Sequence, residues 1–199
     1  MKRVAVIGGS CTGKTTLSRE LARRLGVPHV ELDALHHDSG WQEAPAELLL
    51  ARVEAAFAAA PDGWVADGNY HGKIGTYALE RADTLVFLDL PYATALRRVL
   101  WRTLSRTVTR KELWNGNRET LRNALSRDSI VWWVITQHGK YRQTWPPRYE
   151  ALPHLDVVRL RSQREVRDWL RFQSIQATES MSGSSNESER QKTPPLAET

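Results

Sequence analysis

The sequence has only one cysteine, Cys11, among its 199 residues. A lone thiol excludes an internal disulfide and a zinc cluster built on cysteines. No apolar run approaches the roughly 20 residues that a membrane span requires. The N-terminus also lacks the basic stretch and apolar segment of a secretory signal peptide. We therefore expect a cytoplasmic protein that does not contact a membrane.

The composition is that of a globular protein with a polar end. Hydrophobic residues make up 41% and charged residues 26% of the chain, which suffices for one domain with a sizeable core. Residues 174–199 differ, because they contain six serines and two prolines and offer almost nothing to bury. We predict a single domain over residues 1–173 and a disordered tail over residues 174–199.

Residues 4–16, VAVIGGSCTGKTT, contain a phosphate-binding motif. Gly8, Gly13, Lys14 and Thr15 match the pattern G-x-x-x-x-G-K-[ST]. An apolar run precedes the motif and a helical pattern follows it, which is the strand, loop and helix context that such a motif requires. The sequence therefore predicts a P-loop rather than a glycine-rich turn that only caps an ordinary helix.

Each part of the motif has a chemical role. The glycines allow the backbone to turn so that successive N–H groups face phosphate oxygens, and the following helix adds its positive dipole end. Lys14 is expected to reach the β- and γ-phosphates of ATP, and the Thr15 hydroxyl to bind Mg²⁺. The residues expected to hold the nucleotide are Gly8, Gly9, Ser10, Cys11, Thr12, Gly13, Lys14, Thr15 and Thr16.

Short apolar runs alternate with helical patterns along the chain. The runs with strand character span residues 4–7, 29–33, 64–66, 84–90 and 156–160. Helical patterns begin within the motif and near residues 46, 93, 118 and 162, whereas residues 36–45 and 144–148 are expected to be loops. This alternation predicts an α/β fold of three layers with a five-stranded parallel sheet. Ligands of such sheets bind at the carboxyl ends of the strands.

Three acidic residues follow strand patterns where a ligand is expected. Asp33 and Asp67 each end a strand and should lie on the same edge of the sheet as the P-loop. Either could hold a water of the Mg²⁺ shell or bind an acceptor substrate, and either could instead form a turn or cap a helix. Asp89, close to Pro91, fits both a metal-site acid and a structural role.

The positive charge is concentrated in one segment. The chain carries a formal charge of +5, and residues 97–127 alone carry +7. The basic residues of this segment are Arg97, Arg98, Arg102, Arg106, Arg110, Lys111, Arg118, Arg122 and Arg127. A run of like charge is usually a solvated helix face, but beside a P-loop arginines can stabilise the oxygens of a transferring phosphoryl group. An anionic ligand is therefore expected at this segment.

Several motifs together resemble one family. These motifs are GGSCTGKTT, ELDALHH, VADGNY, LVFLDLP followed by LRRVLWRTLSR, and ELWNGNRETLR. Over about residues 3–172 the chain resembles the adenylate-kinase-like branch of the P-loop kinases, and most closely the bacterial topology modulation (FlaR-type) proteins. The resemblance implies a nucleoside- or shikimate-kinase-like P-loop NTPase fold with a helical lid over about residues 103–140.

The resemblance also implies roles for single residues. In nucleoside monophosphate kinases, the acid of the Asp-Gly pair after the third strand belongs to the Mg²⁺ site, which corresponds to Asp67. Two arginines four residues apart after the fourth strand correspond to Arg98 and Arg102. For the lid arginine we predict Arg118, because Gly116 just before it would allow it to swing. The other lid candidates are Arg106, Arg110, Arg122 and Arg127.

The acceptor side departs from the adenylate kinase pattern. Adenylate kinases have an arginine soon after the second strand and another after the Asp-Gly pair, and both hold the phosphate of AMP. The matching stretches here, DALHHD and DGNYHGK, contain histidines and a lysine but no arginine. Asp33 instead resembles the acid of shikimate- and gluconate-type kinases that meets a substrate hydroxyl. The sequence therefore leaves the acceptor open.

The residues and the resemblance together predict an ATP- and Mg²⁺-dependent phosphotransferase acting on a nucleotide or a small hydroxyl-bearing acceptor. The residues predicted to be catalytic are Lys14, Asp33, Arg98, Arg102 and Arg118, and those predicted to hold the metal are Thr15 and Asp67. A second hypothesis is a nucleic-acid-binding ATPase or regulator that uses residues 97–127 as its contact surface. A third is a toxin-like kinase of a small metabolite. The sequence indicates no oligomeric state.

Overall fold

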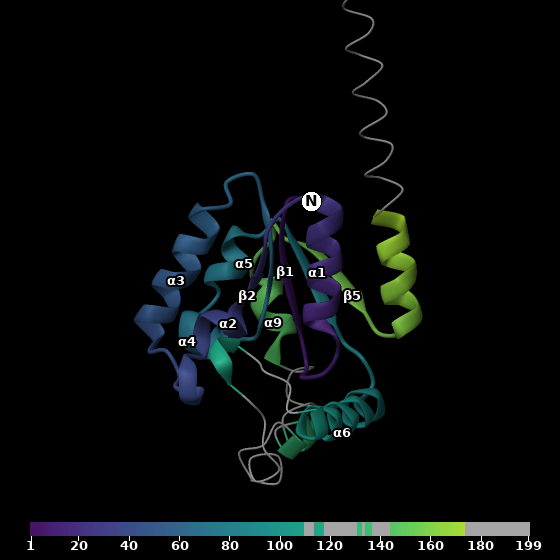
Figure 1. The fold of residues 1–199 in the computed structure, drawn as a ribbon. Helices are drawn as coiled ribbons and strands as arrows, with labels where there is room; N and C mark the ends of the chain where they lie inside the picture. Colours follow the sequence, from purple (N-terminus) through teal and green to yellow (C-terminus); the bar gives the residue numbers. More distant parts are fainter. Residues whose placement is uncertain (110–113, 118–130, 133, 137–143, 174–199) are drawn as a thin grey trace, which may run out of the picture.

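The computed structural model describes residues 1–109, 114–117, 131, 132, 134–136 and 144–173. At its centre lies a sheet of five parallel strands in the order β2-β3-β1-β4-β5. The strands are β1 (Arg3–Gly8), β2 (His29–Glu31), β3 (Trp64–Asp67), β4 (Thr84–Leu88) and β5 (Asp156–Leu160). Helices cover both faces of the sheet (Figure 1). The predicted three-layer α/β fold is thus confirmed.

The helices lie between and after the strands. The α-helices are α1 (Lys14–Leu25), α2 (Leu32–His36), α3 (Ala46–Ala58), α4 (His71–Ile74), α5 (Tyr77–Arg81), α6 (Tyr92–Thr109) and α9 (Pro146–Glu150), and the short 3-10 helices are η1 (Ser39–Trp41) and η2 (Trp114–Gly116). Residues 163–173 form a further helix. Its first turn has the expected capping interaction, because the N–H of Glu165 donates to Ser162 Oγ at 3.1 Å.

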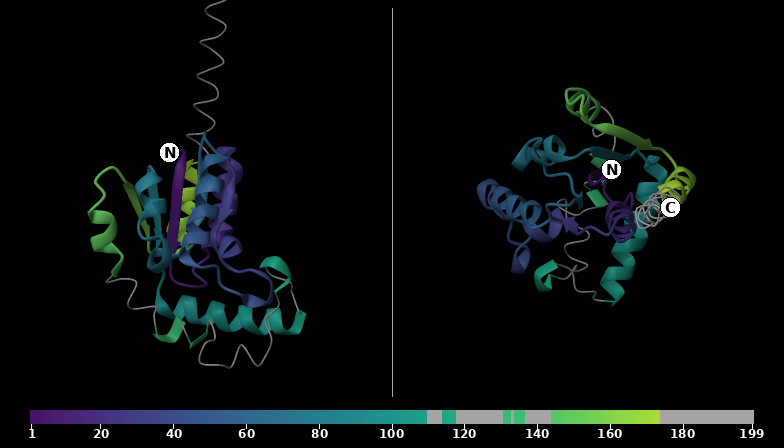
Figure 2. Two further views of the ribbon diagram at one scale, coloured as in Figure 1. Left: turned by 90° about the vertical axis from the view of Figure 1, so that its left-hand side faces the viewer. Right: turned by 90° about the horizontal axis from the view of Figure 1, so that it is seen from above.

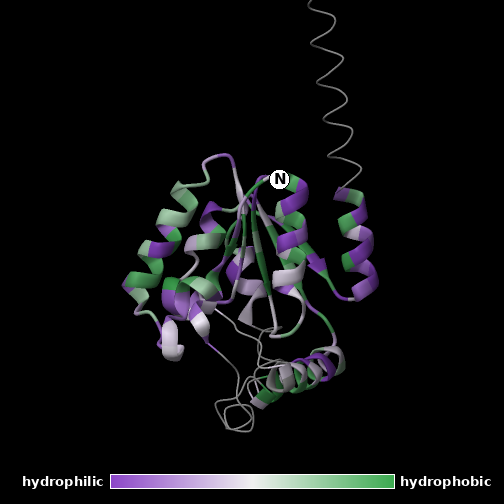
Figure 3. Ribbon diagram, viewed as in Figure 1, coloured by the Kyte–Doolittle hydropathy of each residue, from purple (hydrophilic) through white to green (hydrophobic). Residues whose placement is uncertain are grey.

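The sheet separates two apolar cores, because successive side chains of a strand point to opposite faces. Ala5 and Ile7 of β1 belong to the core under α3, α4, α5 and α9. Val4 and Val6 belong to the core under α1 and the helix of residues 163–173. Figure 3 shows the strands as the hydrophobic centre and the hydrophilic residues on the outer sides of the helices. The β-strands are therefore packed on both faces, and a site at their carboxyl ends lies outside the two cores.

Helix α6 lies outside these layers and runs across the carboxyl ends of the strands (Figures 1 and 2). Its Ala95 and Val99 are buried against Val134. On another side of the helix, Leu100 and Trp101 are exposed. The arginine-rich helix is thereby placed next to the P-loop, which follows β1 at the same end of the sheet.

Several segments differ from the sequence prediction. Strand β2 ends at Glu31, so Asp33 lies in the first turn of α2 rather than in a strand. The prediction of a loop over residues 144–148 was wrong, because α9 begins at Pro146 and proline fits the first turn of a helix. Most of the predicted lid, residues 103–140, and the whole predicted tail lie outside the described residues.

The helices offer no membrane anchor within the described part of the chain. None of those helices combines the length and the apolarity needed to cross a bilayer. The longest of them, α6, carries arginines along its length.

A buried ion pair joins the ends of β4 and β5. Asp89 is 5% exposed, and its Oδ2 accepts hydrogen bonds from Nη2 and Nε of Arg159 at 2.7 and 3.0 Å. The N–H of Asp89 also donates to the carbonyl of Leu160 at 2.9 Å. Of the two roles open to Asp89, these contacts favour the structural one.

The substitution Arg159→Met tests this pair. It removes the cation beside a buried carboxylate, and we expect the free energy of unfolding to fall by about 2–3 kcal/mol, at the low end for buried pairs because Arg159 is 33% exposed. The double variant Asp89→Asn/Arg159→Met should recover most of this loss in urea denaturation. Arg161→Met, at an exposed position, is the matched control. If Arg159→Met and the control Arg161→Met lowered the free energy of unfolding equally, the structural role of the ion pair would be contradicted.

Candidate functional site

The strand order brings two loops together. The chain leaves β1 for β2 on one side of the sheet and leaves β3 for β4 on the other, and ligands of parallel sheets bind at such a switch point. The P-loop follows β1, and residues 68–70 follow β3. The site is therefore built where these two strands end.

The P-loop adopts a conformation that depends on glycine. Gly8 has φ +151°, and a Cβ atom there would lie 2.7 Å from the carbonyl oxygen of Leu88. Gly13 has φ +100° and is the N-cap of α1. The hydroxyl of Thr12 donates to the carbonyl of Gly9 at 2.8 Å and closes the turn. The loop thus keeps the shape that directs backbone N–H groups and the start of α1 to one point.

An asparagine after β3 holds the start of the loop. Asn69 Oδ1 accepts a hydrogen bond from the N–H of Gly8 at 3.3 Å, and its Nδ2 donates to the carbonyl of the same glycine. The sequence analysis quoted the motif VADGNY but assigned no role to this residue. Its only signal was its place next to the Asp-Gly pair, because the contact bridges 61 positions of the chain.

The side chain of Lys14 lies over the P-loop. Its Nζ donates to the carbonyls of Gly8 and Gly9, at 3.1 Å each. Burial lowers the pKa of Lys14, and the carboxylates of Asp33 and Asp67 partly offset this effect. Lys14 is therefore in contact with two loop residues that the sequence singled out, Gly8 and Gly9.

Thr15 and Asp67 are in direct contact. The Thr15 hydroxyl donates to Asp67 Oδ2 at 2.7 Å. The other oxygen, Oδ1, lies 2.6 Å from Nε2 of His29 on β2. Asp67 is only 2% exposed, so both oxygens are held in place. The sequence analysis missed His29, because nothing local distinguishes a histidine at the start of a strand.

The oxygen atoms of Thr15 and Asp67 fit Mg²⁺ better than a metal ion that takes all of its ligands from protein side chains. Among the described residues, no group of three or more His, Cys, Asp or Glu side chains could hold a metal by itself. Mg²⁺ is commonly bound by one or two protein oxygens together with phosphates and waters. A hydroxyl and one carboxylate beside a P-loop match that donor set.

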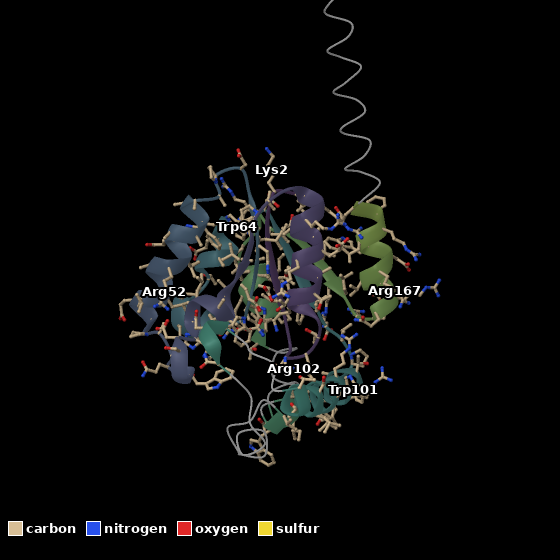
Figure 4. The ribbon with its side chains drawn as sticks, in the orientation of Figure 1. Lys2, Arg52, Trp64, Trp101, Arg102 and Arg167 are labelled. Atoms are coloured by element: carbon tan, nitrogen blue, oxygen red, sulfur yellow. The ribbon has the colours of Figure 1, made fainter. Side chains whose placement is uncertain are left out.

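Two arginines of α6 face the loop. Nη1 of Arg98 donates to the carbonyl of Thr12 at 2.9 Å. Arg102 lies on the side of α6 toward the sheet (Figure 4), and its charge acts on Lys14. Its Nε is buried and has no hydrogen-bond partner among the residues that the structure describes. An unpaired cationic donor beside a P-loop is suited to an anionic ligand.

For the remaining predicted site residues, the structure gives their exposure at most. Ser10 and Cys11 are half-buried within the loop, and Thr16 is exposed on α1. Arg118, the predicted lid arginine, lies outside the described residues.

The other side of the site centres on Asp33. The hydroxyl of Tyr70 donates to Asp33 Oδ1 at 2.7 Å. Burial, and then the negative charge of Asp33, raises the pKa of Tyr70, so the phenol stays a donor. The nearby Lys73 is paired with Glu43 at 2.9 Å. This side therefore offers the carboxylate of Asp33, which is held by the phenol of Tyr70. The charge of the neighbouring Lys73 is balanced by Glu43.

The fold and the site are those of a P-loop protein built on a five-stranded parallel α/β sheet. A family profile described as an AAA domain matches residues 3–89, the part that carries the P-loop, Asp33 and Asp67. No curated protein matches the sequence.

Solved structures of shikimate kinase are similar to this chain. The shikimate kinase from Bacteroides thetaiotaomicron has a TM-score of 0.52 and 16% identity, covering 87% of this chain and 97% of that one. The enzyme from Acinetobacter baumannii, in complex with shikimate, has a TM-score of 0.49 and 16% identity over 86% of this chain and 89% of its own. The enzyme from Aquifex aeolicus has a TM-score of 0.49 and 15% identity over 92% and 98%. At these identities the likeness to the first enzyme shows the fold alone.

The substitution Asn69→Ala tests the contact that holds the loop. It leaves the N–H and carbonyl of Gly8 without their side-chain partner, so we expect the free energy of unfolding to fall by about 1–3 kcal/mol. Urea denaturation followed by circular dichroism measures this change. Asn69→Asp keeps the acceptor for the N–H of Gly8 but places a carboxylate oxygen against the carbonyl of Gly8, so its stability should fall at least as far as that of Asn69→Ala. An unchanged stability in Asn69→Ala would show that the amide does not hold the loop.

Proposed function

We propose that this chain is an ATP- and Mg²⁺-dependent phosphotransferase, which moves the γ-phosphate of ATP to a nucleotide or a small hydroxyl-bearing acceptor. One observation carries the proposal. Lys14 lies on the P-loop beside Thr15, whose hydroxyl is bonded to Asp67. Burial lowers the pKa of Lys14, and the charge of Asp33, which is bonded to Tyr70, partly offsets this effect. A donor site and an acceptor site thereby share one lysine.

The donor half would hold the triphosphate. The backbone N–H groups of the loop and the start of α1 bind the phosphate oxygens, and Lys14 exchanges its two carbonyl partners for the β- and γ-phosphates. Thr15 and Asp67 are the residues that would hold Mg²⁺. The bound metal would neutralise charge on the β- and γ-oxygens.

The two arginines of α6 would act on the phosphoryl group. Arg98 is anchored to the loop through Thr12, and the buried Nε of Arg102 lacks a partner among the described residues. Charge on the oxygens of the moving group would be stabilised by both guanidinium groups. Arg98 and Arg102 lie toward the P-loop and not on an outer surface of α6. Their placement therefore favours a kinase over a protein that binds nucleic acid through this helix.

The acceptor half would bind a hydroxyl group at Asp33. Tyr70 holds one carboxylate oxygen, and the second oxygen accepts the hydrogen bond of the acceptor. The acceptor oxygen then forms a bond to the γ-phosphorus while the bond from that phosphorus to the β,γ-bridging oxygen breaks. The hydroxyl proton passes to Asp33, and ADP leaves. The resemblance to topology modulation proteins and a cytoplasmic location agree with this scheme and stay predictions.

The substitution Lys14→Ala tests the proposal. We expect Mg·ATP affinity by calorimetry to fall at least about tenfold and phosphotransfer about 100-fold or more, because a charged group that contacts the transferred phosphate is lost. Transfer is measured with γ-labelled ATP and a panel of nucleoside monophosphates, nucleosides, sugar acids and polyols. Lys2→Ala, at the opposite end of the sheet (Figure 4), is the control. The proposal fails if the unsubstituted chain binds no Mg·ATP, or if Lys14→Ala transfers phosphate normally.

The substitution His29→Ala tests the placement of Asp67. Partners that orient a metal ligand typically affect metal affinity by about 10–100-fold, so the Mg²⁺ concentration for half-maximal ATP binding should rise by that order. Calorimetric titration of Mg²⁺ at fixed ATP measures it without turnover. His29→Gln, which retains a donor, should restore part of the affinity, and the exposed His154→Ala should change nothing. Identical Mg²⁺ dependence in His29→Ala and the unsubstituted chain would refute this role.

A further inference from the structure

A short segment after α6 is bonded to the loop that follows Asp33. Nδ2 of Asn115 donates to the carbonyls of Ala34 and His37 at 3.3 and 2.5 Å. Nδ2 of Asn117 donates to the carbonyl of Asp38 at 2.9 Å. These contacts join positions 78 to 81 residues apart, and no part of the proposed mechanism uses them.

The second amide atom of Asn117 completes the pairing. Its Oδ1 accepts the N–H of Trp41 at 2.8 Å. Asn117 is only 4% exposed, so its amide is buried with both its donor and its acceptor satisfied. A buried amide in this state is costly to remove, because the backbone groups it serves lose their partners.

The amide of Asn115 caps a helix of only five residues. The last carbonyls of α2 have no partners within the helix. The carbonyl of Leu35 is met by Nη1 of Arg52 at 2.7 Å, and that of His36 by the N–H of Ala44 at 2.8 Å. Asn115 meets the carbonyl of Ala34. The helix that carries Asp33 is thus held by two side chains and one backbone N–H from elsewhere in the chain.

The backbone of the segment is shaped for this contact. Asn115 has φ +54° and Gly116 has φ +80°, a region that asparagine tolerates better than other residues with a side chain. The ring of Trp114 stacks on that of His37, with 5.8 Å between centroids and 22° between planes. It also meets Trp41 edge-on at 6.5 Å. The aromatic contacts and the amide hydrogen bonds therefore both bind residues 34–41.

We infer that Asn115 and Asn117 are positioning residues for the acceptor site. They hold residues 34–41, and through them the turn of α2 that carries Asp33, in one conformation. The inference rests on the proposed function, since it assigns the acceptor to Asp33. It places the determinant of acceptor affinity in the Trp-Asn-Gly-Asn segment, far along the sequence from Asp33 and apart from the P-loop.

Hydrogen exchange and kinetics of Asn117→Ala test the inference together. Peptides covering residues 32–44 should exchange at least about tenfold faster, because the N–H of Trp41 loses its acceptor, whereas peptides covering residues 4–17 should not change. The KM should rise about tenfold for the best acceptor among AMP, adenosine, gluconate and glycerol, a change equal to about one hydrogen bond. The kcat and the Mg·ATP affinity should stay within about twofold.

Three further variants separate the amide from other effects. Asn115→Gly keeps the left-handed backbone accessible and removes only the amide, so it should raise the acceptor KM as Asn115→Ala does. Gln42→Ala, at an exposed side chain of the same loop, should leave exchange and KM unchanged. Thermal unfolding establishes that each variant is folded.

The outcomes of the proposal and of the inference are distinct. Absence of Mg·ATP binding or phosphotransfer in the unsubstituted chain removes the proposed function, and with it the acceptor role. The inference alone is overturned if the chain is active and Asn117→Ala leaves exchange of residues 32–44 unchanged. It is also overturned if the Mg·ATP affinity falls as much as the acceptor KM rises, because the effect is then general.

Discussion

The hydrogen bond from Thr15 to Asp67 is the contact on which the donor half of the site depends. It connects the first turn of α1 to the end of β3 at 2.7 Å, and the two-sided contact of Asn69 with Gly8 lies beside it. Both contacts require β1 and β3 to be neighbours in a parallel sheet, which the strand order provides. The fold therefore acts on the site mainly by bringing one loop and one acidic residue into register.

Positive and negative side chains lie near this bond, and their charges act on Lys14 in opposite directions. Partial burial lowers the pKa of Lys14, and the carboxylates of Asp33 and Asp67 offset only part of this effect. The positive charge of Arg102 lowers the pKa of Lys14 further. Nζ of Lys14 donates to two loop carbonyls, and phosphate oxygens would be stronger partners for an ammonium group. The site is thus prepared for an anion before one arrives.

Local sequence features predicted the parts of the site that depend on local backbone requirements. Gly8, Gly13, Lys14 and Thr15 were identified because a phosphate loop needs these residue types at this spacing, and the strand-end rule found Asp67. The five-stranded parallel sheet followed from the alternation of strand and helix patterns. The proline-rich stretch before Arg148 was misjudged, because proline indicates both a loop and the first turn of a helix.

The partners of those residues could not be predicted in the same way. His29, Asn69 and Asn117 each contact a residue that is far away in the sequence. The separations are 38 positions for His29, 61 for Asn69 and up to 79 for Asn117. A single histidine or asparagine carries no periodicity or spacing that reveals such a contact, and only the folded sheet defines it. The acceptor loop shows this most clearly, because its backbone is bonded to a segment that follows α6 in the sequence.

A crystal structure with Mg²⁺ and a non-hydrolysable ATP analogue tests the central claim most directly. The account predicts the β- and γ-phosphates on the backbone N–H groups of the P-loop, the metal at Thr15 with Asp67 beside it, and Lys14 Nζ moved from the carbonyls of Gly8 and Gly9 to the phosphates. A nucleotide bound away from the loop, or a Lys14 that keeps both carbonyls while the nucleotide is bound, would contradict it.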